Sequence, residues 1–254
     1  AWHDEGGTSG RTRSIQSEFP NRQPTVSWER RLGKPVFSTN ALVASPLGVV
    51  SVQNLGLAVL DPTDGAIQWI YRGSTGRVTM RPRGARDQEG FHSDWNPRIS
   101  VWGHALLVCN ESDVIAFDLL SGKVLNRTNL EPGQRAILLA GGLILAGTTV
   151  AEAVRLDAYA LSSPGAPGVL KWRTKADPDW ALASPQDRFQ PLVGDGFLAV
   201  PLRDGFALLD PKTGEVICRK SNGNQPALAN PSGGILIGGD EGDTECYDAR
   251  GVIR

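Results

Sequence analysis

Apolar residues fall in short runs along the chain, and polar turns separate these runs. In residues 49–72, VVSVQNLGLAVLDPTDGAIQWIYR, a polar turn joins two apolar runs of strand length, and an Asp-Gly turn leads into a third run that contains a tryptophan. Runs of this length, rich in Val, Ile and Leu and bounded by Gly, Asn and Asp, predict β-strands. Helical periodicity is not sustained anywhere in the sequence, so we expect an all-β protein.

The same pattern recurs along the chain. Strong copies lie at 106–128 and 197–220, and weaker copies lie at 143–174 and 234–254. Each copy has a strand, a polar turn, a second strand that ends near an aspartate, a tight turn with a glycine, and an outgoing strand. The best-defined turn positions are Asp61, Gly65, Asp118, Gly122, Asp210, Gly214 and Asp248. Units of about 40 residues with this content are typical of β-propeller blades.

The residues of the tight turn have defined chemical roles. The aspartate carboxylate accepts hydrogen bonds from backbone N–H groups two or three residues later, which fixes the hairpin. The glycine adopts the positive φ angle that a β-branched residue adopts only at a cost. The copy at 143–174 carries insertions on both sides of its turn, and we place Ser162 and Gly168 at these two positions.

A tryptophan four residues after the turn glycine marks the outer strand. Trp69 and Trp172 occupy this position, and we expect each ring to dock on the neighbouring blade while its indole N–H finds a carbonyl. Trp28 lies in a similar outer strand, TVSWERRL at 25–32, that has no Asp-turn before it. We therefore predict that this N-terminal strand completes the last blade, which would close the ring and remove a strand edge.

These observations predict a single β-propeller domain at 25–254, preceded by an extended leader at 1–24. We expect five four-stranded blades, with an inserted loop at 73–98 between the first two. The alternative is that the chain forms part of a larger ring whose open blade edge needs a partner.

The outer hairpin follows the pattern A-x-D-x-x-(T/S)-G-x-x-x-W and resembles the pyrroloquinoline quinone (PQQ) repeat of β-propellers. The resemblance covers residues 25–254 and is strongest at 49–72. It implies one of two kinds of function. Quinoprotein dehydrogenases of this family hold PQQ and Ca²⁺ over the central channel. Non-enzymatic members, such as the lipoprotein subunit of the outer-membrane β-barrel assembly machinery, use the same scaffold for protein contacts.

We favour the non-enzymatic branch for this chain and expect no bound cofactor. The quinoproteins have a disulfide ring formed by two adjacent cysteines, whereas Cys109, Cys218 and Cys246 are isolated in this sequence. Those enzymes also have more repeats than this chain. We therefore expect a non-catalytic scaffold subunit that binds protein partners in a larger, membrane-associated assembly. The alternative is a PQQ-dependent dehydrogenase-like enzyme, or a fragment of one, with PQQ and Ca²⁺ bound over the channel.

Charge and hydropathy narrow the class of partner. The 254 residues carry 26 basic and 27 acidic side chains, a formal charge of −1, which argues against a surface for nucleic acid. No apolar run approaches the roughly 18 residues of a membrane span, so we expect membrane contact only through a partner. The polar start at Ala1 fits a mature chain after signal-peptide removal, or a shortened chain. The first interpretation implies the periplasm or another extracytoplasmic compartment.

Neither cysteine nor histidine spacing predicts a metal site. The odd number of cysteines allows at most one disulfide, for which Cys218 and Cys246 are the candidates, and free thiols buried in strands are the favoured interpretation. The segment GGDEGDTE at 238–245 has carboxylates at alternate positions that suit Ca²⁺. Because it aligns with the inner hairpin turns of the other copies, a solvated turn is favoured.

Two segments that do not repeat are the candidate partner-binding surfaces. The long insertion at 72–98 combines arginines with aromatic residues, a composition suited to an acidic partner or a carboxylate ligand. Loops of this length are uncommon unless they are functional or flexible. A second irregular stretch lies at 175–191. The candidate residues in the two segments are Arg77, Arg81, Arg83, Arg86, Phe91, His92, Trp95 and Trp180.

Overall fold

Antiparallel β-strands make up all of the regular secondary structure in the computed structural model, over the residues that it describes. These residues are 29, 42–53, 56–72, 77–80, 98–110, 113–181, 191–194, 196–221, 227–230, 234–238, 244–248, 250 and 252. Across these ranges, no helix is long and apolar enough to cross a membrane.

The described strands form five sheets, which we call blades 1 to 5. Blade 1 contains β1 (Leu42–Ser45), β2 (Gly48–Gln53), β3 (Gly56–Leu60), β4 (Ile67–Arg72) and β5 (Arg77–Met80). Blade 2 contains β6 (Arg98–Trp102), β7 (Ala105–Asn110), β8 (Asp113–Asp118) and β9 (Val124–Asn129).

The remaining blades follow in chain order. Blade 3 contains β10 (Arg135–Ala140), β11 (Leu143–Val150), β12 (Ala153–Leu161) and β13 (Gly168–Arg173). Blade 4 contains β14 (Leu192–Val193), β15 (Leu198–Leu202), β16 (Gly205–Leu209) and β17 (Val216–Ser221). Blade 5 contains β18 (Ala227–Asn230), β19 (Gly234–Gly238) and β20 (Thr244–Asp248).

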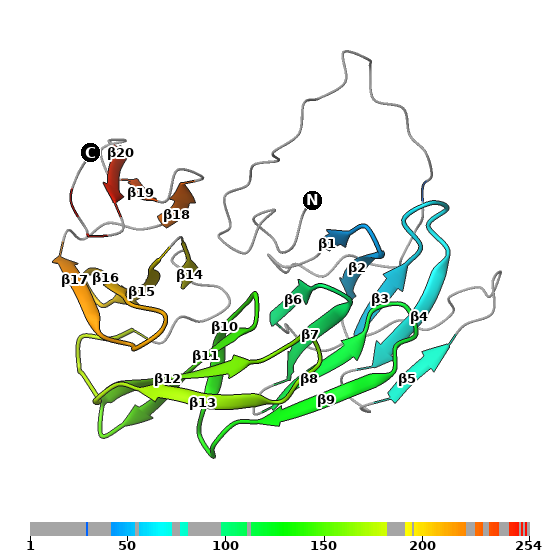
Figure 1. Ribbon diagram of the computed structural model, residues 1–254, viewed down its shortest axis with the longest axis horizontal. Coiled ribbons are helices and arrows are strands. Elements are labelled where there is room, and N and C mark those ends of the chain that lie inside the picture. The colour runs from blue at the N-terminus through cyan, green and yellow to red at the C-terminus, as the bar shows by residue number, and fades with distance from the viewer. Residues whose placement is uncertain are drawn as a thin grey trace, which may run out of the picture.

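The blades are arranged as in a β-propeller, which confirms the predicted fold class. Within each blade the strands pair in chain order, and the blades follow one another along an arc from blue blade 1 to red blade 5 (Figure 1). The first strands of successive blades are neighbours: β1 lies beside β6, β6 beside β10, β10 beside β14, and β14 beside β18. The hydrophobic core consists of layers between successive blades.

The blades differ in strand number from the expected uniform four. Blades 2, 3 and 4 have four strands, whereas blade 1 has a fifth strand, β5, formed by residues 77–80 of the inserted segment. Blade 5 has three strands among the described residues. The strand at 25–32 that we predict as its fourth, with Trp28, lies outside the described residues apart from Glu29, as does the leader at 1–24.

An aspartate organises the tight turn that follows the third strand in every blade except blade 3. The aspartate carboxylate accepts a backbone hydrogen bond two or three residues later: Asp61 from Thr63 (2.8 Å), Asp118 from Ser121 (2.8 Å), Asp210 from Lys212 (2.6 Å) and Asp248 from Arg250 (2.8 Å). We call these the Asp-turns. Hydrogen bonding to Ser121 is the main reason that the pKa of Asp118 is lowered.

The glycine of the Asp-turn has a positive φ angle, at 69° for Gly65, 68° for Gly122 and 76° for Gly214. The position we predict for this glycine in blade 3 is wrong. The positive φ angle there belongs to Gly165, at 81°, whereas Gly168 already begins β13. The inserted residues lengthen this turn, so alignment with the shorter copies shifts the glycine by three residues.

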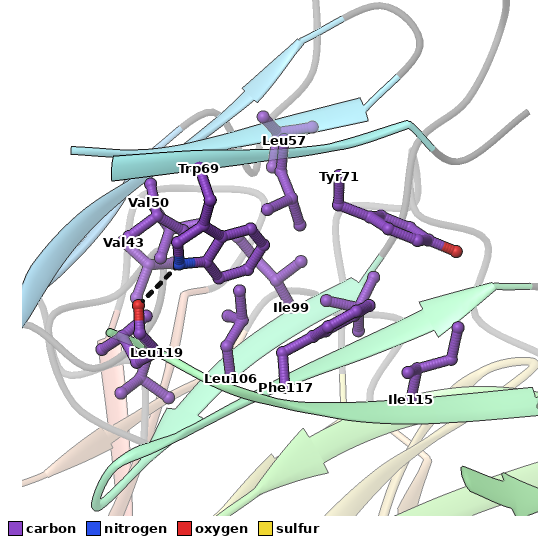
Figure 2. Close-up of a cluster of buried hydrophobic side chains, with 14 residues drawn as sticks. Val43, Val50, Leu57, Trp69, Tyr71, Ile99, Leu106, Ile115, Phe117 and Leu119 are labelled. Carbon is purple, nitrogen blue, oxygen red and sulfur yellow. Dashed lines mark hydrogen bonds between the residues drawn. The ribbon is translucent and has the colours of Figure 1, made fainter. Parts of the chain in front are cut away.

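Trp69 and Trp172 each join their own blade to the Asp-turn of the next blade. The indole Nε1–H of Trp69 donates a hydrogen bond to the carbonyl of Leu119, at 2.8 Å, and Leu119 directly follows Asp118 (Figure 2). The indole of Trp172 donates in the same way to the carbonyl of Pro211, at 3.0 Å, directly after Asp210. A buried indole N–H requires such an acceptor, so the tryptophan fixes both the spacing and the register of two blades.

The fourth strand of each of blades 1 to 4 also has a β-bulge directly before the tryptophan position. The pairing between the third and fourth strands skips one residue in each case, and these residues are Gln68, Leu125, Lys171 and Ile217. A bulge bends a strand and increases its twist. The bulge thus accompanies the turn of each outer strand toward the neighbouring blade.

Replacing Gly214 by alanine tests the packing of the tryptophan on the Asp-turn. A Cβ atom at Gly214 would lie 2.5 Å from the ring of Trp172, in addition to the strain of the positive φ angle. Gly196 is the matched control, because its φ angle is 79° and a Cβ there would meet nothing within 4 Å. We expect Gly196→Ala to lower the free energy of unfolding by about 1 kcal/mol and Gly214→Ala by about 3 kcal/mol, measured by urea denaturation. Equal losses would contradict the proposed packing.

Candidate functional site

The predicted partner-binding residues fall largely outside the described part of the chain. Residues Arg81, Arg83, Arg86, Phe91, His92 and Trp95 lie outside the described residues. Arg77 begins β5, which pairs with β4 along the outer edge of blade 1. The structure therefore places the start of the inserted segment against blade 1. Trp180 is the one predicted partner residue whose side chain is described.

Trp180 belongs to a segment that crosses from blade 3 to blade 4. We call residues 174–181, between β13 and β14, the strap. The Trp180 side chain is only 2% exposed and packs in the core layer between the two blades together with Trp172. Its indole therefore offers little surface of its own to a partner and instead fixes the strap to the propeller.

Backbone hydrogen bonds attach the strap to both blades. Asp177 and Val154 of β12 exchange two hydrogen bonds, each of 3.0 Å, as in an antiparallel sheet. Further along the strap, Arg203 donates to the carbonyl of Asp179, at 2.9 Å, and Ala181 donates to the carbonyl of Pro201, at 3.2 Å. The strap thus pairs with one strand of each blade and connects them at the same end of the ring.

Arg219 of β17 holds the strap from the side. Its guanidinium donates to the carboxylates of Asp177 and Asp179 and lies 5.0 Å from the ring centre of Trp180. The hydrogen bond from Arg219 is the largest cause of a lowered pKa at Asp177. One cation therefore combines two carboxylates and an aromatic face, an arrangement in which a planar guanidinium is more effective than an ammonium group.

Beside the strap, the hairpin of β11 and β12 extends further than its equivalents. These strands have eight and nine residues, whereas the corresponding strands of the other blades have five or six. The turn residues Ala151 and Glu152 both have positive φ angles, of 47° and 68°. A two-residue hairpin turn of this kind normally contains Asn or Gly, so this turn is strained. Arg203 contacts it by donating to the carbonyl of Glu152, at 3.4 Å.

Together these parts form one surface at the end of the ring where the second and third strands of each blade are joined. We call it the junction surface and define it by the hairpin tip 149–153, the strap, Arg203 and Arg219. Val150 is 41% exposed on the hairpin, and the remaining exposed groups carry both charge signs. The junction surface therefore combines an apolar group with charges of both signs.

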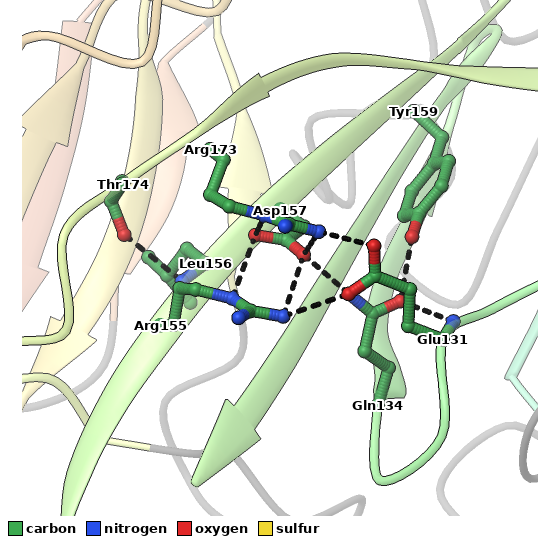
Figure 3. Close-up of polar contacts among 8 residues, drawn as sticks. All are labelled: Glu131, Gln134, Arg155, Leu156, Asp157, Tyr159, Arg173 and Thr174. Carbon is green, nitrogen blue, oxygen red and sulfur yellow. Dashed lines mark hydrogen bonds and ion pairs between the residues drawn. The ribbon is translucent and has the colours of Figure 1, made fainter. Parts of the chain in front are cut away.

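A buried ionic network supports the junction surface from within blade 3 (Figure 3). The carboxylate of Asp157 on β12 is 1% exposed. Arg173, opposite it on β13, binds it through two hydrogen bonds of 3.0 and 2.8 Å, and Arg155 lies at 3.3 Å. Gln134 donates a further hydrogen bond to the same carboxylate. A buried carboxylate is tolerated only with such a set of donors.

The network extends to the connection between blades 2 and 3. Glu131 accepts hydrogen bonds from Arg173, at 2.6 Å, and from Arg155, at 3.0 Å. Tyr159 donates to the side-chain carbonyl of Gln134, at 2.6 Å, and this oxygen also accepts the backbone N–H of Glu131. Two carboxylates and two guanidinium groups balance in charge. The network therefore holds the 131–134 turn and the base of the β11–β12 hairpin in one arrangement.

The network residues are not among those predicted from the sequence, although the sequence contains two signals of them. Asp157 interrupts an apolar strand. It pairs with the residue that follows the tryptophan position on the outer strand, and the residues with the same pairing in the other blades are apolar: Ala58, Ile115 and Ala207. The residue directly after the tryptophan position is an arginine in three successive blades, and these arginines are spaced 46 residues apart: Arg127, Arg173 and Arg219. Each of these arginines pairs with a carboxylate.

The described cysteines are free thiols. Cys218 forms no disulfide, so the candidate bridge to Cys246 is not formed. Cys109 is buried between blades 2 and 3, and burial raises the pKa of its thiol to about 11. It is thus protonated at neutral pH and acts as a small apolar side chain. Within the described ranges, no group of three His, Cys, Asp or Glu residues is placed to bind a metal ion.

Comparisons with known proteins give both a family and structural neighbours. A family model described as "Outer membrane protein assembly factor BamB" matches residues 23–220. BamB from Moraxella catarrhalis is 15% identical, with a TM-score of 0.47, over 89% of this chain and 62% of its own. A europium-containing methanol dehydrogenase is 12% identical, with a TM-score of 0.59, over 99% of this chain and 57% of its own.

Further matches are more distant. Hsv2p of Kluyveromyces lactis is 9% identical, with a TM-score of 0.42, over 80% of this chain and 71% of its own. No curated protein sequence matches the chain. The likeness to methanol dehydrogenase shows the propeller fold alone. The chain spans about six-tenths of the length of the BamB and methanol dehydrogenase structures.

Substitution of Asp157 tests the buried network. Asp157→Asn keeps the shape of the side chain but leaves Arg155 and Arg173 without their shared buried anion. We expect a loss of about 3 kcal/mol in the free energy of unfolding, measured by urea denaturation. The matched control is Asp113→Asn, which removes an ion pair with Arg127, a residue whose side chain is 47% exposed, and should cost less than about 1 kcal/mol. Similar losses in the two variants would contradict a structural role for the network.

The lowered pKa of Asp177 predicts how the strap responds to acid. The ionised carboxylate stabilises the folded chain at pH values above its unfolded pKa of 3.8, and this stabilisation is lost as the pH falls through the lower folded value. We therefore expect the stability difference between the wild type and Arg219→Gln to be constant from about pH 7 to pH 5 and to shrink below about pH 4. A residual difference from the stacking on Trp180 should persist. A difference that does not change with pH, measured by urea denaturation, would exclude this coupling.

Proposed function

The chain belongs to the family described as outer membrane protein assembly factor BamB, and from this premise we propose that it is a non-catalytic, extracytoplasmic scaffold subunit. In this proposal the propeller binds a protein partner within a larger assembly. The family description supports a role in assembly rather than a chemical reaction. The proposal includes a periplasmic or equivalent location, and contact with a membrane only through the partner.

The junction surface is the observation that carries the proposal. The repeated parts of the blades, namely the Asp-turns, the bulges and the tryptophans, are accounted for by contacts between blades. Among the described residues, the extended β11–β12 hairpin and the strap occur at blades 3 and 4 and at no other blade. Surfaces that depart from a repeat in this way are where a repetitive scaffold acquires a specific partner.

The physical state of the junction surface favours binding. Association loses less entropy when the surface is already ordered, and the strap, Arg203 and Arg219 order this surface through backbone and ionic contacts. Val150 adds an exposed apolar group to this surface. The surface also carries charges of both signs, from Glu152, Asp179 and Arg203, which suit a protein surface better than a polyanion.

Two exposed aliphatic residues at opposite ends of the ring provide a test. Val150 is the last residue of β11, beside the turn between the second and third strands of blade 3, and Leu120, which is 52% exposed, lies in an Asp-turn between the third and fourth strands of blade 2. We expect Val150→Glu to weaken capture of the partner from the solubilised envelope fraction at least tenfold, and Leu120→Glu to leave it unchanged. The measurement is quantitative mass spectrometry of proteins retained by the immobilised variants, with equal thermal stability as the control.

The enzymatic alternative is tested in the same preparation. Addition of PQQ and Ca²⁺ to the purified chain, followed by equilibrium dialysis, should leave both unbound. Binding of one PQQ per chain would overturn the scaffold proposal. Equal capture of all envelope proteins by the wild type and Val150→Glu would overturn the junction surface as the binding site.

A further inference from the structure

The β11–β12 hairpin has one unpaired edge among the described residues. The pairing of β10 with β11 ends at Arg135 and Gly147, whereas β11 continues to Val150. Residues 148–150 therefore pair with β12 on one side only. On the opposite side of the hairpin, the strap pairs with β12.

The register shows which backbone groups face this open edge. In an antiparallel pair, residues whose N–H and C=O groups face each other alternate with residues whose groups face outward. Val154 exchanges both of its hydrogen bonds with Asp177 of the strap, so its groups face outward from β12. Thr149 is the partner of Val154 in the register, so its N–H and C=O face outward from β11. No described residue bonds to these two groups.

This edge lacks the features that protect the outer edges of the blades. The outer strands β9, β13 and β17 each have a bulge and a basic residue, at Arg127, Lys171 and Arg219 respectively. Bulges and charged side chains of this kind discourage pairing with another strand. The run Thr148-Thr149-Val150 has no charge, proline or register shift, and its three residues are β-branched. It is thus well suited to strand pairing.

We propose that the open edge of β11 at Thr149 binds an extended segment of the partner protein as an added strand. This inference rests on the proposed function and identifies the mode of recognition at the junction surface. The added segment exchanges two backbone hydrogen bonds with Thr149. The contact reproduces, on the other side of the same hairpin, the two bonds that Asp177 makes with Val154. An extended segment of the chain itself is therefore the internal precedent for the occupant.

The side chains around Thr149 indicate what the partner segment contains. Val150 is exposed next to the open edge and provides an apolar contact for a neighbouring aliphatic side chain. The backbone hydrogen bonds at Thr149 give affinity without sequence preference, while the side chains next to Thr149 give selectivity. Because the edge is short, we expect the added strand to contribute to a larger interface rather than to bind as an isolated peptide.

The hairpin is held ready for this pairing. The strap fixes β12 at Val154, and Arg203 contacts the carbonyl of Glu152 in the turn. The edge thus keeps its extended conformation in the absence of the partner, and binding does not require a hinge. The strain at Ala151 and Glu152 is compatible with a turn that the surrounding contacts impose.

Hydrogen exchange at single-residue resolution tests the proposal, with the solubilised envelope fraction of the source organism as the probe. The Thr149 amide should exchange freely in the isolated chain and at least tenfold more slowly in the captured complex. The amides of Thr148 and Val150 face β12 and should change less, which makes them internal controls. A captured complex with unchanged exchange at Thr149 would overturn the strand-pairing inference while leaving the scaffold proposal intact. Failure to capture any protein would overturn both.

A pair of substitutions separates the backbone from the side chain. Thr149→Pro removes the outward N–H, which bonds to none of the described residues, and should weaken capture at least tenfold. Thr149→Ala keeps that N–H and should bind within twofold of the wild type. Equal binding by the two variants would contradict the inference. Thermal denaturation checks that both are folded, and the exchange measurement on the wild type stands if the proline variant is not.

Discussion

The structure depends on burying both faces of the central strands of the described blades, and the packing of successive blades covers these strands. Strands such as β3, β15 and β16 are buried along their whole length, so they have no solvent face. Apolar packing alone would allow one sheet to slide on the next. The indole hydrogen bonds of Trp69 and Trp172 prevent such sliding, because each indole must reach one particular carbonyl in the Asp-turn of the following blade. The Asp-turn is therefore both a hairpin turn and the acceptor site of its neighbour.

Blade 3 has a charged residue, Asp157, where the other blades bury an apolar one, and this difference has consequences at the surface. Asp157 replaces an apolar residue in the face toward blade 2, which places a carboxylate where the repeat has hydrocarbon. Arg155, Arg173 and Gln134 compensate it, and each of them also fixes a further segment. Polar satisfaction thus links the 131–134 turn, the outer strand and the base of the long hairpin. A local exception in the core thus fixes the base of the hairpin that carries a non-repeating surface.

The sequence was sufficient for the parts of the fold that depend on local chemistry. The Asp-Gly turns and the tryptophan position follow from residues a few places apart, and so the blade repeat was predictable. Asp157 was not, because its partners Gln134 and Arg173 come from a connection and a strand that are distant from it in the sequence. Trp180 was selected as an aromatic residue in an irregular loop, but its burial depends on contacts with both blades that no local pattern encodes. Gly165 was missed because an insertion changed the spacing on which the alignment relied.

The distribution of strand edges connects the fold to its proposed use. A propeller of separate sheets has an outer edge on every blade, and the described outer edges are managed in different ways. The outer strand of blade 1 is covered by β5, whereas β9, β13 and β17 combine a bulge with a basic residue. Such protection is needed because an unprotected edge pairs with any available strand. An edge left open on a rigid hairpin, beside an ordered strap, is therefore better explained by selective pairing than by a failure of the repeat. Selectivity then comes from the surrounding junction surface, which limits the strands that can approach.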